Sequence, residues 1–290
     1  MLLFNKKIAD DLNLSSPYEL VKSGNWTIDA MSEMMKAATR DLNGDTVMDE
    51  NDCWGYLSQA HPVLPGFWVG AGAESVSKNS DDIPEFTLAG DQHFAEIVEK
   101  VFKITWDDGT WFKDVTRANY DTTSRDMFAN NKGLFHDSTF YNITLLRGMD
   151  TDFGVLPYPK WDSSQDQYYS RVEGGDFPMI PNTNNRLEMT GVLLEALASE
   201  SAKSVIPEYY EKVLKGKGAR DDESEDMLDI IYNNRVYDLG DTYWCTSLRG
   251  GFLMTMFETG NRDLASNIAK KQASVEKEIK KVVDAFMALE

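Results

Sequence analysis

The order of apolar and polar residues along the chain predicts helices separated by short strands. Met31 and Met35 fall on one face of the stretch WTIDAMSEMMKAATRD, at the spacing of an amphipathic helix. Ser16 and Glu19 flank Pro17 as in a capping box, which predicts a short helix that begins at this proline. Comparable patterns predict helices over residues 17–21, 26–41, 91–105, 123–133, 186–201, 207–216, 222–234 and 262–289.

Apolar runs that are too short for helices predict buried strands. The clearest are GLFHDST, residues 133–139, and FGVLPYP, residues 153–159, the second of which ends at prolines. The stretch HPVLPGFWVGAGAESVS, residues 61–77, contains prolines and glycines throughout and is predicted to be rich in loops. Long helices that alternate with short apolar strands indicate an α/β fold, not a helical bundle or a β-sandwich.

The composition is that of a folded, acidic protein. Of the 290 residues 42% are apolar, which is enough for a packed core in one or two domains. The chain has 29 basic and 48 acidic residues, so its formal net charge is −19. Because proteins recognise nucleic acids and anionic membranes through clustered Lys and Arg, this charge argues against both partners.

Cysteine content and hydropathy limit the cellular context. Cys53 and Cys245 are too few for a disulfide framework, and we expect two separate buried thiols. The chain has no run of about 18 apolar residues, so we expect no direct membrane insertion. Its opening, MLLFNKKIADD, becomes charged too early for the apolar region of a signal peptide. Taken alone, these features predict a cytoplasmic or a truncated protein.

Residues 41–52, DLNGDTVMDEND, form a dense acidic stretch after the helix over 26–41. Their oxygen-bearing residues have the ligand spacing of a twelve-residue calcium loop, although Asp52 replaces the usual final Glu. Thr46 stands where Gly normally takes the sharp turn, and a positive φ there would cost about 1–2 kcal/mol. A solvated acidic turn is the alternative. We expect a structural Ca²⁺ site formed by Asp41, Asn43, Asp45, Val47, Asp49 and Asp52.

No pattern typical of catalysis is found. His61, His93 and His136 are the only histidines, and their spacing is not that of a metal site. GAGAES lacks the Gly-x-Ser-x-Gly elbow of serine hydrolases, and there is no phosphate-binding loop. Carboxylate pairs for glycoside hydrolysis cannot be singled out among 48 acidic residues. We therefore expect a protein that is not an enzyme.

Residues 133–181 carry a more specific pattern. A short strand leads through a polar loop to a helix with Leu-Arg, then to FGVLPYP, and then to a Tyr-rich stretch that ends in Ile-Pro. This pattern resembles the extracellular solute-binding proteins of bacterial ABC importers, in the group that mostly carries sugars. The resemblance extends back to FNKKIADDLNL and forward through residues 207–239 to the last helix, so it covers essentially the whole chain.

The resemblance implies a periplasmic-binding-protein-like fold of type II, in which two α/β lobes close on a ligand. It places residues 1–170 and 236–290 in a complete C-terminal lobe and residues 171–235 in a partial N-terminal lobe. Members of this family usually begin with a signal peptide, often with a lipoprotein cysteine, and with most of the N-terminal lobe. By resemblance we expect an extracytoplasmic, cell-surface lipoprotein as the parent of this chain, with ABC permease subunits as its partners.

The resemblance also indicates which residues should face the ligand. Sugar sites use aromatic faces against the pyranose ring and Asp, Asn or Arg side chains for its hydroxyl groups. Glycine lets a ligand approach the backbone. Core packing is the alternative for each aromatic residue. The candidates are Trp68, Asp137, Ser138, Thr139, Gly174, Gly175, Asp176, Tyr243, Trp244 and Arg249.

We therefore expect the substrate-binding component of an ABC transporter, which binds a carbohydrate, by preference an oligosaccharide, for import. A binding protein for a peptide or another solute on the same scaffold is the first alternative. A calcium-stabilised carbohydrate-active enzyme is the second alternative.

Overall fold

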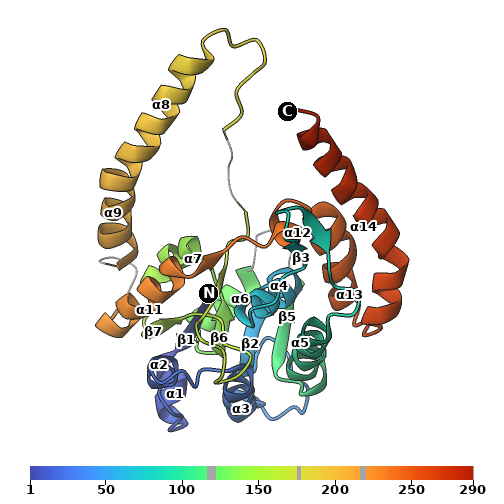
Figure 1. The fold of residues 1–290 in the computed structure, drawn as a ribbon. Helices are drawn as coiled ribbons and strands as arrows, with labels where there is room; N and C mark the ends of the chain where they lie inside the picture. Colours follow the sequence, from blue (N-terminus) through green and yellow to red (C-terminus); the bar gives the residue numbers. More distant parts are fainter. Residues whose placement is uncertain (116–121, 175–177, 216–219, 290) are drawn as a thin grey trace.

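The computed structural model contains a central α/β body with helices that extend from it (Figure 1). The predicted α/β class is therefore confirmed. The residues that the structure describes are 1–115, 122–174, 178–215 and 220–289.

Five strands form the central sheet, in the order β5-β2-β6-β1-β7. β1 runs antiparallel to β6 and β7, whereas β2 runs parallel to β5 and β6. All residues of β1 and β7 are buried, so other elements cover the sheet on both faces. The strands are β1 (Leu2–Asn5), β2 (Trp54–Gln59), β5 (Trp111–Asp114), β6 (Gly133–Asp137) and β7 (Phe153–Leu156).

Two smaller pairs of strands lie outside the central sheet. An antiparallel pair joins β3 (Val76–Lys78) to β4 (Pro84–Phe86). A parallel pair joins β8 (Ser170–Arg171) to β9 (Arg235–Val236), so it connects two segments that are distant in the sequence.

The first half of the chain supplies most of the helices around the sheet. Here η marks a π-helical or 3₁₀ segment. These helices are α1 (Lys6–Asp11), α2 (Pro17–Lys22), α3 (Ile28–Ala38), α4 (Ala60–Gly70), α5 (Gln92–Phe102), η1 (Lys103–Asp107), α6 (Thr122–Ala129), α7 (Phe140–Leu145) and η2 (Leu146–Gly148).

The described residues from Leu187 onward are mostly helical. Their helices are α8 (Leu187–Glu200), η3 (Ser201–Val205), α9 (Ile206–Tyr209), η4 (Tyr210–Lys215), α11 (Asp222–Asn233), α12 (Leu239–Thr242), η5 (Thr246–Met254), α13 (Thr255–Glu258) and α14 (Leu264–Met287).

Several predicted elements are confirmed. The Oγ atom of Ser16 accepts a hydrogen bond from the backbone N–H of Glu19, as expected for the cap of α2. α3 buries Met31 and Met35 completely, as its apolar spacing indicated. β6 and β7 lie within the two predicted strands, and α14 covers most of the predicted last helix.

The prediction of a loop-rich segment over residues 61–77 was wrong for its first half, which forms α4. Pro62 lies in the first helical turn, where its missing N–H would have no acceptor within the helix. Pro65 lies inside the helix, where its missing N–H does remove a hydrogen bond. Burial of Leu64 and Phe67 outweighs that loss, because both side chains are fully buried in the core.

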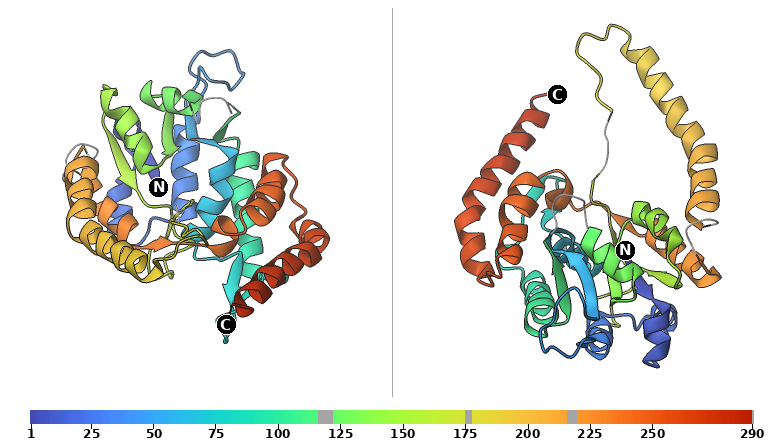
Figure 2. Two further views of the ribbon diagram at one scale, coloured as in Figure 1. Left: turned by 90° about the horizontal axis from the view of Figure 1, so that it is seen from above. Right: turned by 180° about the vertical axis from the view of Figure 1, so that it is seen from behind.

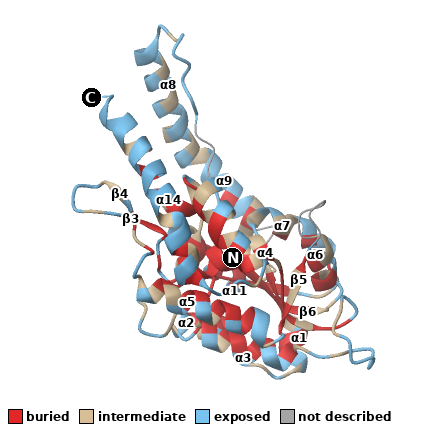
Figure 3. Ribbon diagram, turned by 90° about the vertical axis from the view of Figure 1, so that its right-hand side faces the viewer, coloured by how far each residue is buried: buried red, intermediate tan, exposed pale blue. Residues whose placement is uncertain are grey.

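α8 and α14 project from the same side of the body (Figures 1 and 2). Residues 187–215 form one continuous helical segment of α8, η3, α9 and η4, where the sequence predicted two separate helices. α8 itself has no buried residue, in contrast to the densely buried body (Figure 3).

Two further expectations concern thiols and membranes. Both cysteines are free, and Cys53 is buried as expected, whereas Cys245 is only half-buried and not buried as predicted. Among the described residues, none of the helices combines the length and the apolar content that crossing a bilayer requires.

Candidate functional site

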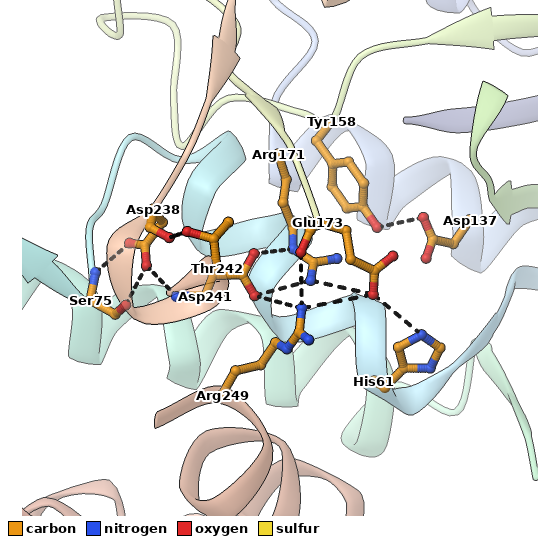
Figure 4. A network of polar contacts seen from close by, with 10 residues as sticks. All are labelled: His61, Ser75, Asp137, Tyr158, Arg171, Glu173, Asp238, Asp241, Thr242 and Arg249. Atoms are coloured by element: carbon orange, nitrogen blue, oxygen red, sulfur yellow. Dashed lines mark hydrogen bonds and ion pairs between the residues drawn. The ribbon is translucent and has the colours of Figure 1, made fainter. Parts of the chain in front are cut away.

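Polar side chains gather at the edge of the sheet where β2, β6 and β7 end (Figure 4). β7 runs in the same direction as β6, because both are antiparallel to β1. His61 follows β2, Asp137 ends β6 and Tyr158 follows β7, so one edge collects all three. Ligands of open α/β sheets bind outside the carboxyl ends of the strands, which makes this edge the candidate site.

The centre of the cluster is the fully buried carboxylate of Asp241 in α12. It accepts hydrogen bonds from Arg171 Nε at 2.5 Å and Arg171 Nη2 at 3.0 Å. Arg249 Nη1, from η5, also donates to it at 3.3 Å. Burial opposes the charge of Arg171, but the hydrogen bonds that Arg171 donates to Asp241 outweigh this effect and raise the pKa of the guanidinium. The ion pair therefore joins three separate segments of the chain.

Glu173 is bound more loosely than Asp241. Its Oε1 atom lies 3.7 Å from Arg171 Nη2, 3.8 Å from Arg249 Nη1 and 3.8 Å from His61 Nε2. These distances are too long for direct hydrogen bonds, so Glu173 is held mainly by the attraction of its charge to the two arginines. The Glu173 side chain is 47% exposed, so a ligand could compete for the groups around it.

Asp137 faces the same cluster from β6 (Figure 4). Its Oδ1 atom accepts a hydrogen bond of 2.8 Å from the hydroxyl of Tyr158. Burial raises the pKa of Asp137 and lowers the pKa of His61. The ring of Tyr158 lies directly against Gly66 of α4, where any Cβ atom would overlap it.

A second buried carboxylate positions α12. Asp238 caps this helix by accepting the backbone N–H of Asp241 at 2.7 Å. It also accepts the backbone N–H of Ser75 at 2.6 Å and the Ser75 hydroxyl at 2.5 Å. Asp238 therefore fixes the start of the helix that presents Asp241 to the two arginines.

The cluster includes or adjoins several residues predicted from the sequence. Asp137 and Arg249 belong to it directly, and Gly174 is exposed immediately after Glu173. Tyr243 is 55% exposed and lies between Asp241 and Arg249 in the chain. Their contact with a ligand stays a prediction.

Two other predicted residues follow Asp137. Ser138 is buried. Thr139 caps α7, where its Oγ1 atom accepts a hydrogen bond from the backbone N–H of Asn142. The remaining candidates at the lobe crossing, Gly175 and Asp176, lie outside the described residues.

The structure corrects the placement of the two tryptophans. Trp68 was expected in a loop that faces a cleft, but it lies in α4, is fully buried and packs against Phe94 with ring centroids 5.5 Å apart. Trp244 is only 4% exposed. Both positions fit core packing, because a buried ring cannot stack on a sugar without a rearrangement.

Sequence reasoning missed much of the cluster. The missed residues come from four segments that are distant in the sequence. Only the folded chain brings these segments into contact. One signal was present, since a polar residue directly after a short apolar strand lies at the carboxyl edge of a parallel sheet. The missed residues are His61, Tyr158, Arg171, Glu173 and Asp241.

The acidic loop of residues 41–52 turns its carboxylates toward its own backbone. Asp41 accepts backbone hydrogen bonds from Gly44 at 2.6 Å and Thr46 at 2.8 Å. Asp52 is buried and accepts the backbone N–H groups of Leu42 and Asp49, each at 2.9 Å. Thr46 adopts a φ of 68°, the positive value expected for the sixth position of a calcium loop.

The acidic side chains of this loop do not point toward a common centre that could hold an ion. Among the described residues, no group of three or more His, Cys, Asp or Glu side chains is placed to hold a metal ion. The backbone thus fits a calcium loop at its sixth position, whereas the carboxylates would have to turn inward to bind the ion.

A separate hollow lies away from the polar cluster. Its volume is about 1210 Å³, and its lining comes from α3, α5, the start of α14 and Trp161. Lys100 Nζ lies 4.1 Å from the centre of the Trp161 ring and pairs with Asp29 at 2.9 Å. None of the residues of the polar cluster lines this hollow, so the two are separate features.

The comparisons with known proteins concern the fold. No protein-family model and no curated protein sequence matches this chain significantly. Solved structures do match. A maltose/maltodextrin-binding domain from Bdellovibrio bacteriovorus, bound to maltotriose, is 18% identical with a TM-score of 0.58, covering 97% of this chain and 70% of that chain.

Two further structures agree with this match. An ABC substrate-binding protein from Listeria monocytogenes, in complex with cycloalternan, is 12% identical, with a TM-score of 0.59 and coverage of 98% of this chain and 69% of that chain. A sugar transporter protein from Arthrobacter chlorophenolicus, with bound laminaribiose, is 14% identical with a TM-score of 0.59. The match covers 97% of this chain and 69% of that chain. The chain therefore has the type II periplasmic-binding-protein-like fold of the sugar-binding proteins of ABC transporters.

Proposed function

We propose that this chain is the substrate-binding component of an ABC transporter and binds an oligosaccharide for import. The observation that carries the proposal is the polar cluster at the carboxyl edge of the sheet, on a fold shared with sugar-binding proteins. Three of the solved structures that this chain matches contain a bound sugar, which is maltotriose, cycloalternan or laminaribiose. The work of such a protein is selective binding, without a chemical step.

The cluster offers the groups that a sugar requires. Of the nitrogens of Arg249, only Nη1 lies near Asp241 and Glu173, so the guanidinium keeps donors for hydroxyl groups. Glu173 can accept hydrogen bonds from hydroxyl groups, because its own contacts are long and its side chain is half-exposed. The exposed ring of Tyr243 supplies an apolar face for a pyranose ring.

The direct test is a melting-temperature series with maltotriose, cycloalternan and laminaribiose, and with a tripeptide as a control. A ligand at about 100 times its dissociation constant should add about 2.7 kcal/mol of stability. A rise in melting temperature with one of the sugars supports the proposal. A rise with the tripeptide alone would favour a peptide-binding protein, and release of a shorter sugar would favour the carbohydrate-active enzyme.

A matched pair of arginine variants tests the site itself. Arg249→Gln should weaken sugar binding by about 1.5–3 kcal/mol, since it removes hydrogen bonds from a charged donor. Arg262→Gln is the control, because Arg262 pairs with Asp107 beside the separate hollow. Isothermal titration calorimetry measures both. Equal sugar affinities of the two variants would show that Arg249 does not contribute to sugar binding.

We further propose that the loop of residues 41–52 binds Ca²⁺ as a structural ion. The positive φ of Thr46 supports this proposal, because calcium loops need that conformation at the sixth position. A chelator should lower the melting temperature, and added Ca²⁺ should restore it. If Asp41→Ala melts like the native protein with and without Ca²⁺, the loop is a solvated acidic turn.

The cellular setting belongs to the same proposal. The matched structures include an ABC substrate-binding protein and a sugar transporter protein. Delivery of a sugar to an importer requires binding outside the cytoplasmic membrane, with ABC permease subunits as the partners. We therefore propose an extracytoplasmic location and a cell-surface lipoprotein as the parent form. Fractionation of the cells, followed by palmitate labelling, checks both points.

A further inference from the structure

The two arginines of the polar cluster use their hydrogen-bond donors in different ways. Arg171 donates to both carboxylate oxygens of Asp241, through Nε at 2.5 Å and through Nη2 at 3.0 Å. These two N–H groups lie side by side on one edge of the planar guanidinium, so they match the two oxygens of a carboxylate. The donor pair of Arg171 is therefore fully used by a carboxylate of the protein itself.

The same donor pair of Arg249 is not used in this way. The contacts of Arg249 with the cluster all involve Nη1, which lies 3.3 Å from Asp241 Oδ1, 3.5 Å from the carbonyl oxygen of Glu173 and 3.8 Å from Glu173 Oε1 (Figure 4). In the part of the chain that the structure describes, Nε and Nη2 of Arg249 donate no hydrogen bond. These two nitrogens are called the free donor pair below.

The environment of Arg249 favours a charged acceptor for this pair. The Arg249 side chain is only 19% exposed, so much of its charge is removed from water. Asp241 lies between the guanidinium groups of Arg171 and Arg249, and one carboxylate cannot neutralise both. A partly desolvated guanidinium gains most from an acceptor that carries the opposite charge, because such hydrogen bonds are the strong ones.

The other carboxylates of the cluster do not complete the charge balance. Glu173 lies too far from both arginines for hydrogen bonds, and its side chain is 47% exposed, so water and salt screen its charge. Asp137 bonds to Tyr158 instead, and burial raises the pKa of Asp137, which disfavours its charged form. An anion that reaches Arg249 therefore meets a positive charge that the protein has not fully neutralised.

The neighbouring residues leave space for a ligand. A Cβ atom placed on Gly174, directly after Glu173, would meet no atom of the described chain within 4 Å. Tyr243 follows Asp241 by two residues and is 55% exposed, so its ring is open to an apolar sugar face. Open space and an exposed ring thus adjoin the residues that Arg249 contacts.

We propose that the free donor pair of Arg249 binds a carboxylate of the sugar, so that the preferred ligand is an acidic oligosaccharide that contains a uronic acid. This inference rests on the sugar-binding function proposed above and specifies its substrate class. The ligand carboxylate would take the arrangement that Asp241 already has with Arg171. A neutral hexose carries a hydroxymethyl group at the same carbon, which offers one oxygen and no charge.

The test compares sugars that differ only in this group. Maltotriose and laminaribiose are each paired with the derivative whose terminal C6 hydroxymethyl group is replaced by a carboxylate. Isothermal titration calorimetry at pH 7 in 150 mM NaCl gives the four dissociation constants. We expect an acidic sugar to bind at least about ten times more tightly than its neutral counterpart.

Two matched variants locate the group that recognises the carboxylate. Arg249→Lys keeps the positive charge but loses the donor pair, so the preference for the acidic sugar should fall to about twofold or less. Arg262→Lys is the control, because Arg262 also binds a carboxylate through two nitrogens, that of Asp107, outside the polar cluster. The control should keep the preference of the native protein. Melting temperatures show whether each variant is folded.

The outcomes separate this inference from the function on which it rests. If a neutral sugar binds as tightly as its acidic counterpart, or more tightly, the ligand is not an acidic sugar, whereas the sugar-binding function stands. A preference that survives in Arg249→Lys also overturns the inference, because another group then recognises the carboxylate. If the folded native protein binds none of the four sugars, the sugar-binding function is contradicted and the inference falls with it.

Discussion

At the scale of single residues, the structure depends on the carboxylate of Asp241 more than on any exposed charge of the site. Asp241 is fully buried between two guanidinium groups, and Arg171 is itself only 8% exposed. Removing one partner of a buried pair leaves the other charge without compensation, and that loss is much larger than the net value of the pair.

Asp241→Asn should therefore lower the free energy of unfolding by about 3–5 kcal/mol. Asp284→Asn is the matched control, because Asp284 pairs with Lys280 on the exposed surface of α14 and should contribute less than about 1 kcal/mol. Urea unfolding followed by circular dichroism measures both values. Comparable losses for the two variants would show that the buried pair is not a structural anchor.

Asp137 should make stability depend on pH. Burial raises the pKa of Asp137 in the folded protein above that of the unfolded chain, which is about 3.9. Between the two values the folded state binds more protons, so the contribution of Asp137 to stability falls as pH rises above about 4. Asp137→Asn removes this loss. The stability of the variant relative to the native protein should increase with pH, by at most about 1.4 kcal/mol per pH unit.

This prediction is checked by unfolding both proteins at a series of pH values between 4 and 8. Asn can still accept the hydrogen bond from Tyr158, so the comparison isolates the charge. A difference in stability that stays constant over this range would mean that Asp137 is not desolvated.

At the scale of elements, the acidic loop stores backbone strain at one position. Thr46 has a φ of 68°, and a β-branched residue in this region costs about 1–2 kcal/mol. Thr46→Gly should therefore raise the free energy of unfolding, by about 1 kcal/mol. Gly44→Ala, in the same loop at a φ of 77°, should lower it by a similar amount. Thermal unfolding without Ca²⁺ measures both, and a shift of the same sign for the two variants would contradict the assignment of strain.

The elements also show what local sequence could and could not predict. The start of α2 was predictable, because Ser16, Pro17 and Glu19 act within one turn. α4 was not, because its two prolines favour a loop locally and only the burial of Leu64 and Phe67 in the assembled core favours a helix. Trp68 was misplaced for the same reason, since its exposure depends on the conformation of α4.

At the scale of the whole molecule, the alternation of helices and strands in the sequence predicted the class of the fold. It did not predict which charged residues of the candidate site would pair with one another. Arg171 and Asp241 are 70 residues apart in the sequence. They meet only because β8 pairs with β9, which brings the two segments together. Arg249 was predictable from family resemblance, but its partner Asp241 required the three-dimensional structure.

The net charge of −19 makes a prediction for the whole molecule. Repulsion among like charges destabilises a compact state, and salt screens that repulsion. The melting temperature should rise when sodium chloride increases from 10 mM to 150 mM. Differential scanning calorimetry provides the measurement, and a falling melting temperature would show that surface ion pairs outweigh the general repulsion.

The position of β1 in the sheet has a consequence for how the protein is made. β1 begins at Leu2, yet it lies between β6 and β7, where Leu3 pairs with His136 on one side and Val155 on the other. The 127 residues between Asn5 and Gly133 must therefore be synthesised before β1 can pair with either neighbour. Contacts of such long sequence separation form slowly, so the nascent apolar strand stays exposed to chaperones and to aggregation during that time.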